Sequence, residues 1–84
     1  MNSILEIKMR VQAFDTEHRT NLYELVSQYV LHWRELTFEH RLSAQLFHEM
    51  EEQLWQRLEK EKWNGSPQQL NTICGHIEKE FVPA

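Results

Sequence analysis

The positions of glycine and proline constrain this fold more than any other feature of the sequence. The 84-residue chain has two of each, Gly65, Gly75, Pro67 and Pro83, so its first 64 residues contain neither. An all-β chain needs turn residues every eight to twelve positions or so, which this stretch does not provide. Twelve of the thirteen acidic residues are Glu, which loses little side-chain freedom in a helix, and only Asp15 is Asp. The sequence therefore predicts an all-α protein.

The length predicts a single helical domain over residues 1–84. At this size folding buries only about 60% of the surface that the unfolded chain exposes. We therefore expect a small three- to four-helix bundle in up-down order without a deep, enclosed substrate cavity. Completion of the bundle by a second copy of the chain remains an alternative.

Apolar residues at helical spacing predict helices at roughly 3–14, 16–35, 39–63 and 67–81. In the first helix Ile4, Ile7, Val11 and Phe14 form one stripe. Asp15 with Thr16 is expected to break or kink the chain after that stripe, since their side chains compete with helical hydrogen bonds. The first two segments are then either two helices or one kinked helix. The second stripe, which starts at Leu22, is broad enough to contact two neighbouring helices.

The middle of the chain allows two interpretations. One is a single helix from about 20 to 63, which would be roughly 65 Å long and would need a second chain to cover it. The other is a turn near Leu36–Arg41, with Thr37 capping the next helix. We favour the turn. His40 and His18 lie near the apolar stripes and are expected at a helix interface, the alternative being a pH-sensitive polar layer.

The last helix has the clearest boundaries. Asn64 and Gly65 tolerate the left-handed backbone that ends a helix. The run Ser66-Pro67-Gln68-Gln69 then has the form of a capping box with proline at the first helical position. The helix that follows presents Leu70, Ile73, Cys74, Ile77 and Phe81, and Pro83 is expected to stop it.

Net charge and cysteine content indicate the class of partner and the compartment. Nine Lys and Arg against thirteen Asp and Glu give a net charge of −4, which argues against a general binder of nucleic acid or of anionic membranes. No apolar stretch approaches the roughly 18 residues of a membrane span. The charges of Glu6, Lys8 and Arg10 would interrupt the core of a signal peptide. With a single cysteine, Cys74, the chain suits a reducing compartment, and we expect a cytoplasmic protein.

Residue patterns for catalysis and metal binding are weak. His48 with Glu52, and His76 with Glu80, each lie four residues apart and could together clasp a metal ion in a bundle core. Glu is so frequent that such pairs are expected by chance, so we predict no metal site and no cofactor. A glycine-rich neighbourhood for a nucleophile and a phosphate-binding loop are both absent, so we expect no enzyme. A His/Glu metal-binding bundle ranks third among the functions considered.

Acidic residues are concentrated in one segment. The cluster consists of Glu49, Glu51, Glu52, Glu59 and Glu61. Such a run is usually a solvated helix face. The alternative function is an acidic helical inhibitor that presents this face to a nucleic-acid-binding protein. Direct nucleic-acid binding is not expected, because Glu59 and Glu61 interleave the basic residues of the same helix.

Nine aromatic residues are many for so small a core. Several large apolar residues fall off the core stripes, and together with two neighbouring arginines they predict a partner-binding set: Leu31, Arg34, Phe38, Arg41, Leu42 and Trp55. The competing interpretation is that another helix covers them. We expect a non-enzymatic protein–protein interaction module, such as a small regulator, inhibitor or assembly adaptor, with another protein or a second copy as partner.

Overall fold

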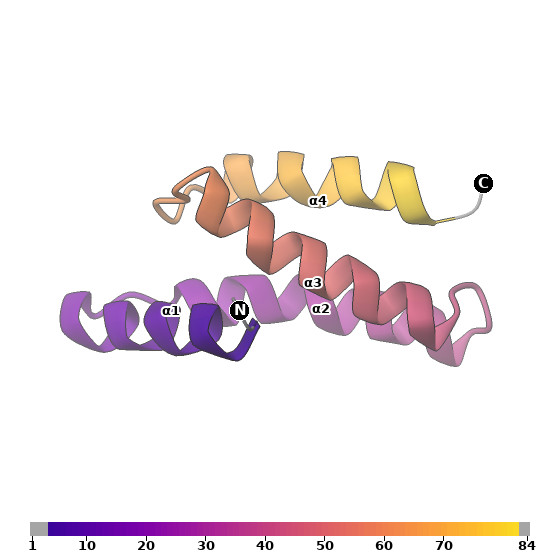
Figure 1. Ribbon diagram of the computed structural model, residues 1–84, viewed down its shortest axis with the longest axis horizontal. Coiled ribbons are helices and arrows are strands. Elements are labelled where there is room, and N and C mark those ends of the chain that lie inside the picture. The colour runs from indigo at the N-terminus through magenta and orange to yellow at the C-terminus, as the bar shows by residue number, and fades with distance from the viewer. Residues whose placement is uncertain (1–3, 83–84) are drawn as a thin grey trace.

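The protein is all-α, as the sequence predicted. The computed structural model describes residues 4–82, and within them it contains four helices and no strand: α1 (Ile4–His18), α2 (Leu22–Phe38), α3 (Ala44–Lys60) and α4 (Pro67–Phe81) (Figure 1). The prediction that Pro83 ends the last helix lies outside these residues. No described helix combines the length and the apolar character needed to cross a bilayer.

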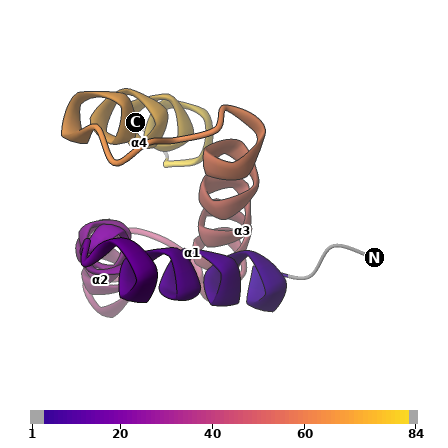
Figure 2. The same cartoon turned by 90° about the vertical axis from the view of Figure 1, so that its left-hand side faces the viewer.

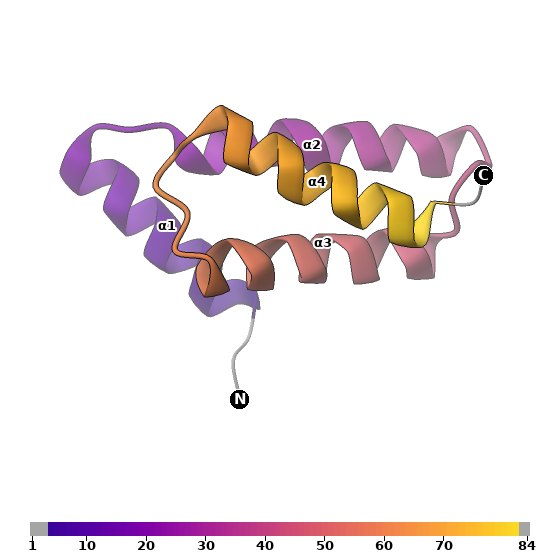
Figure 3. The same ribbon diagram turned by 90° about the horizontal axis from the view of Figure 1, so that it is seen from above.

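The four helices surround a core that lies mainly between α2, α3 and α4. Each helix runs roughly opposite to the one before it (Figure 1), while α1 crosses α2 obliquely (Figure 3). Both α2 and α3 contact all the other helices, and no contact joins α1 to α4 within the described chain. Figure 2 shows α1 and α4 on opposite sides of the fold, with α3 spanning the distance between them.

Aliphatic and aromatic side chains build the core. Its largest fully buried side chains are Trp33, Trp55, Met50, Leu54, Leu70, Ile77, Val26 and Cys74. None of them comes from α1, in which Ile7 is the only buried residue. No polar or charged side chain is buried among the described residues. His18 and His40 are both exposed, so neither their expected position at a helix interface nor the alternative of a buried polar layer holds for this part of the chain.

A turn separates α2 from α3, so the favoured interpretation of the middle segment is confirmed. The backbone reverses at residues 39–43, where His40 has a φ of 59°. Ser43 caps α3, because its side chain accepts a hydrogen bond from the Leu46 N–H at 3.1 Å. The prediction that Thr37 is this cap is wrong. Thr37 lies inside α2 and its hydroxyl donates to the carbonyl of Arg34 at 2.6 Å.

The junction of α1 and α2 is made differently from the prediction. α1 continues through Asp15 to His18, and the chain turns at Arg19, which has a φ of 54°. Asp15 does not break its own helix but caps the next one. Its carboxylate accepts the backbone N–H groups of Leu22 and Tyr23, each at 2.9 Å. These bonds satisfy donors that a helix start leaves free, and they establish two separate helices in place of one kinked helix.

The junction of α3 and α4 follows the sequence pattern closely. The Ser66 side chain accepts from the Gln69 N–H at 3.3 Å, and Pro67 opens the helix. The Ser66 N–H donates to Asn64 Oδ1 at 3.2 Å, so the predicted capping box forms only in its Ser66 half and the Gln69 side chain does not complete it. Gly65 has a φ of +93°, and a Cβ there would lie 2.6 Å from Cδ2 of Leu22. The positive φ and the approach of Leu22 both explain why glycine stands at this corner.

Candidate functional site

Two large apolar residues of the predicted partner-binding set are exposed on one face of α2. Leu31 is 56% exposed and Phe38 71% exposed, and they lie two helical turns apart. Between them stands Arg34, whose guanidinium carbon is 5.9 Å from the centre of the Phe38 ring. We call Leu31, Arg34 and Phe38 the α2 outer strip. The opposite face of the same helix is buried at Val26, Trp33 and Leu36.

Arg41 lies beyond the end of this strip. It is exposed in the turn after α2 and pairs with Glu39 at 3.6 Å. Both side chains are more than half exposed, so water and salt screen the pair and it holds Arg41 only weakly. Arg41 therefore stays available to a partner, next to the α2 outer strip in sequence.

Leu42 and Trp55 do not lie on an exposed surface, which corrects the prediction for these two residues. Leu42 is 5% exposed and Trp55 1% exposed. Leu42 lies beyond the end of α2, so the helical angle that placed it opposite the core does not apply to it. Trp55 lies on a helix that three others contact, and its ring packs against Tyr23 with centroids 5.6 Å apart. Neighbouring elements cover both residues, as the competing interpretation held.

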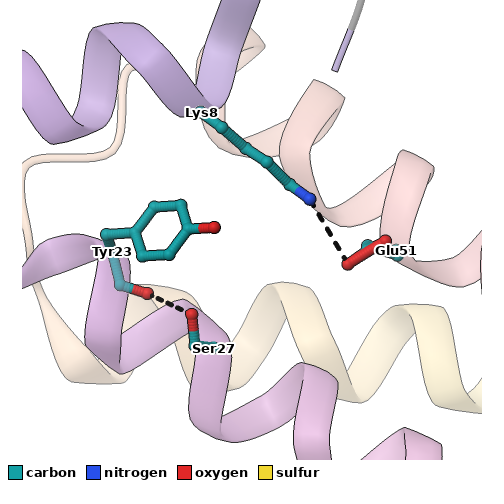
Figure 4. A network of polar contacts seen from close by, with 4 residues as sticks. All are labelled: Lys8, Tyr23, Ser27 and Glu51. Carbon is teal, nitrogen blue, oxygen red and sulfur yellow. Dashed lines mark hydrogen bonds and ion pairs between the residues drawn. The ribbon is translucent and has the colours of Figure 1, made fainter. Parts of the chain in front are cut away.

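A polar cluster joins α1 to α3 above Trp55. Lys8 Nζ lies 3.7 Å from Glu51 Oε2 and 5.9 Å from the centre of the Trp55 ring. Figure 4 shows Lys8 reaching from α1 toward Glu51, with Tyr23 and Ser27 of α2 close by. The Ser27 hydroxyl donates to the backbone carbonyl of Tyr23 at 2.8 Å. This cluster links α1 to α3, and the contacts of Lys8 and Tyr23 with the Trp55 ring show how an aromatic residue off the core stripe becomes buried.

The predicted acidic face is divided by α1. Glu51 pairs with Lys8, and Glu59 pairs with Arg10 at 2.5 Å. The remaining three members, Glu49, Glu52 and Glu61, are exposed. Two of the five carboxylates thus face a cation of the chain itself. A protein that mimics nucleic acid needs unpaired negative charge, so this arrangement weakens the acidic-inhibitor alternative.

An open cleft of about 250 Å³, the α1 cleft, lies beside α1. Its apolar lining comes from three helices and the loop after α3: Ile7, Val11, Phe14, Leu22, Leu58 and Trp63. Arg10, Glu59 and Lys62 complete its lining. Sequence reasoning missed this cleft because it assigned the stripe of α1 to the core. A signal in the sequence was Trp63, a large aromatic residue that lies off the stripe of apolar residues running from Phe47 to Leu58.

The histidine–glutamate pairs are not brought together. Glu80 Oε2 accepts a hydrogen bond from Arg57 at 2.7 Å, and the His48 ring contacts Phe47 with centroids 5.5 Å apart. Across residues 4–82 no group of three or more His, Cys, Asp or Glu side chains is placed to hold a metal ion. The metal-binding alternative therefore has no geometric support in this part of the chain.

Two neighbouring titratable side chains, Cys74 and Tyr29, have raised pKa values. Burial, and then the nearby charge of Glu78, raise the pKa of the Cys74 thiol to about 12, so it stays protonated and weakly nucleophilic at neutral pH. Burial, followed by Cys74 and Glu78, also raises the pKa of Tyr29, whose hydroxyl donates to Asn71. Cys74 therefore fits the role of a small buried hydrophobic residue better than that of a nucleophile.

Comparison with known proteins finds no matching family model, no significantly similar curated protein and no significantly similar solved structure. Any assignment of function therefore has to come from the residues of this chain.

Proposed function

We propose that this protein is a non-enzymatic protein–protein interaction module that docks on the α2 outer strip. The observation that carries the proposal is the exposure of Leu31 and Phe38, 56% and 71%, on one side of a helix whose other side is buried. Large apolar side chains grouped on a surface are typical of binding sites, and aromatic and arginine residues are the usual anchors.

The chemistry of the strip favours a partner with an apolar groove bordered by a carboxylate. Covering an exposed Leu or Phe side chain completely gains about 1.5–3 kcal/mol, so the two residues can anchor an interface but need further contacts around them. Arg34 makes none of the ion pairs found in the described chain, so its charge is available to an acidic group of the partner. Arg41 adds a second cation near the same end of α2.

A second copy of the chain fits the strip less well than a different protein. A two-fold contact centred on the strip would bring each Arg34 close to its own copy, and like charges that face each other oppose association. A heterologous partner with acidic groups avoids this repulsion. Docking of this kind suits a small regulator, inhibitor or assembly adaptor, and the lone buried cysteine suits the reducing cytoplasm.

The test compares Phe38→Asp with Leu5→Asp. Leu5 is 64% exposed on α1, so the control places the same charge at an equally exposed apolar position away from the strip. Nuclease-treated lysate of the native host is passed over the wild type and both variants, and any captured protein is purified and titrated by calorimetry. We expect Phe38→Asp to weaken the interaction by about fivefold or more, since anchor residues cost over about 1 kcal/mol on truncation, and Leu5→Asp to leave it unchanged.

Circular dichroism and analytical ultracentrifugation accompany the titration. If Phe38→Asp unfolds the chain, Phe38 belongs to the core and the proposal is wrong. Equal affinity of both variants would also contradict it. If ultracentrifugation shows that the wild type is a dimer and that Phe38→Asp dissociates it, the partner of the strip is a second copy of the chain and not a different protein.

A further inference from the structure

The geometry of the α1 cleft points to a second site, and we propose that it binds a small amphipathic anion, namely an apolar chain with one carboxylate. This site lies away from the α2 outer strip and does not depend on the function proposed for it. The cleft combines an apolar lining with a cationic rim, and these two properties together define the class of ligand.

The lining provides the apolar half of the site. Ile7, Val11 and Phe14 contribute from α1, and Leu22, Leu58 and Trp63 form the facing wall. An enclosed apolar cavity of about 150 Å³ in another protein holds a benzene ring. The α1 cleft, at about 250 Å³, has room for a larger apolar group than one ring. Phe14 is 43% exposed in the free protein, so a ligand that covers it would remove apolar surface from water.

The facing wall is held in a fixed position. The Trp63 Nε1–H donates to the backbone carbonyl of Ser66 at 2.9 Å, which orients the indole ring and leaves its face for apolar contact. Leu22 packs closely against Gly65, and a Cβ built at Gly65 would lie 2.6 Å from the Cδ2 atom of Leu22. A wall that is already ordered costs little conformational entropy when a ligand binds.

The rim determines the sign of the ligand's charge. Arg10 is paired with Glu59 at 2.5 Å, so these two charges largely compensate each other. Lys62 makes none of the side-chain hydrogen bonds or ion pairs found in the described chain, and it lines the same cleft. The rim therefore has one uncompensated positive charge beside an apolar surface. A carboxylate is attracted there and an ammonium group is repelled.

The experiment titrates the labelled protein with octanoate, octanol and octylammonium, which share a chain and differ in charge. Two-dimensional amide NMR spectra, including the indole signal of Trp63, report binding. We expect saturable shifts confined to the cleft, with octanoate binding about three- to fivefold more tightly than octanol, as suits an exposed charge pair. Octylammonium is expected to bind most weakly.

Two variants locate the charge. Lys62→Gln should lower the affinity for octanoate to that for octanol, and the octanol affinity should not change. Lys60→Gln is the matched control, because Lys60 is an exposed lysine of the same corner that does not line the cleft. It should leave both affinities as they are.

Three results would overturn the proposal. The first is an absence of saturable shifts at millimolar octanoate. The second is equal binding of octanoate and octanol with no effect of Lys62→Gln, which would leave an apolar cleft without preference for an anion. The third is shifts that spread over the whole chain, which would indicate detergent-like unfolding and no site.

A further variant, Val11→Trp, fills the cleft with a larger side chain. It should abolish binding of octanoate, and circular dichroism checks that the variant still folds.

Discussion

The helices α1 and α4 are both 15 residues long, yet they are attached to the fold by different forces. α4 buries Leu70, Ile73, Cys74 and Ile77 against the core, whereas α1 buries Ile7 alone. α1 adds the partly buried Ile4 and Val11 and two ion pairs to α3, Lys8 with Glu51 and Arg10 with Glu59. Ion pairs that stay partly exposed to water, as these do, contribute only about 1 kcal/mol each, below the contribution of several buried aliphatic side chains. The comparison teaches that helices of equal length can differ widely in how firmly they are held.

The same difference explains where the open cleft lies. A helix that buries several residues fills the space beneath it, as α4 does on α3. α1 reaches the fold through one buried isoleucine, the partly buried Ile4 and Val11, and long charged side chains, and the space beside Val11 and Phe14 remains partly empty. The candidate ligand site is thus a consequence of the weaker apolar attachment of α1.

The largest expected effect tests the comparison directly, through Ile77→Ala in α4 and Ile7→Ala in α1. Ile77 is 0% exposed and Ile7 is 4% exposed, so the two changes remove the same buried groups. We expect Ile77→Ala to lower the free energy of unfolding by about 3–4 kcal/mol, because it leaves a closed cavity. Ile7→Ala should cost about 2 kcal/mol, since its site adjoins an open cleft. Urea denaturation with unchanged m-values measures both, and equal costs would contradict the comparison.

Asp15 provides the one strong polar link from α1 to the start of α2. Partial burial by itself would raise the pKa of Asp15. Its carboxylate accepts hydrogen bonds from the Thr20 hydroxyl and from the N–H groups of Tyr23 and Leu22, and these bonds lower the pKa. The hydrogen bonds outweigh burial, so the pKa of Asp15 lies below its ordinary value of 3.8. We expect Asp15→Ala to lower the free energy of unfolding by about 1–2 kcal/mol at neutral pH, the usual cost of losing a helix cap.

The stability that Asp15→Ala removes should decrease as the pH falls. A carboxyl group whose pKa is lower in the folded state binds fewer protons there than when unfolded, so its stabilisation is present above pH 3.8. That stabilisation disappears as the pH falls below 3.8 and through the folded-state pKa. Urea denaturation of both proteins across this range should show the stability difference shrinking toward acid pH. A difference that persists undiminished would mean that the charge of Asp15 is not what caps α2.

Replacing the two glycines should change the free energy of unfolding in opposite directions, with the smallest effect at Gly75. Gly65, at the corner that leads into α4, has a φ of +93° and lies against Leu22. Gly65→Ala should cost about 1–2 kcal/mol, because a side chain disfavours this backbone conformation. Gly75 lies inside α4, and a Cβ there would meet nothing within 4 Å. Gly75→Ala should therefore stabilise the protein by about 0.5–1 kcal/mol. Thermal unfolding of both variants measures the contrast, and the same sign for both would contradict it.

Sequence reasoning succeeded where a feature depended on neighbouring residues. The start of α4 was predicted to the residue because Ser66 and Pro67 act on the backbone next to them. The turn between α2 and α3 was predicted in the right region, although its cap is Ser43. The helical angle also placed Leu31 and Phe38 off the core stripe of their helix, although it left open whether another helix covers them.

The sequence by itself determined the all-α class, a bundle of three to four helices and the start of the last helix. Only the tertiary structure decided that Asp15 caps the following helix, that Leu42 and Trp55 are covered, and that α1 divides the acidic face and borders a cleft. The physical reason is that periodicity gives the angle of a side chain around its own helix axis. It does not say which distant helix lies on that side, and burial, ion pairing and open space all depend on that neighbour.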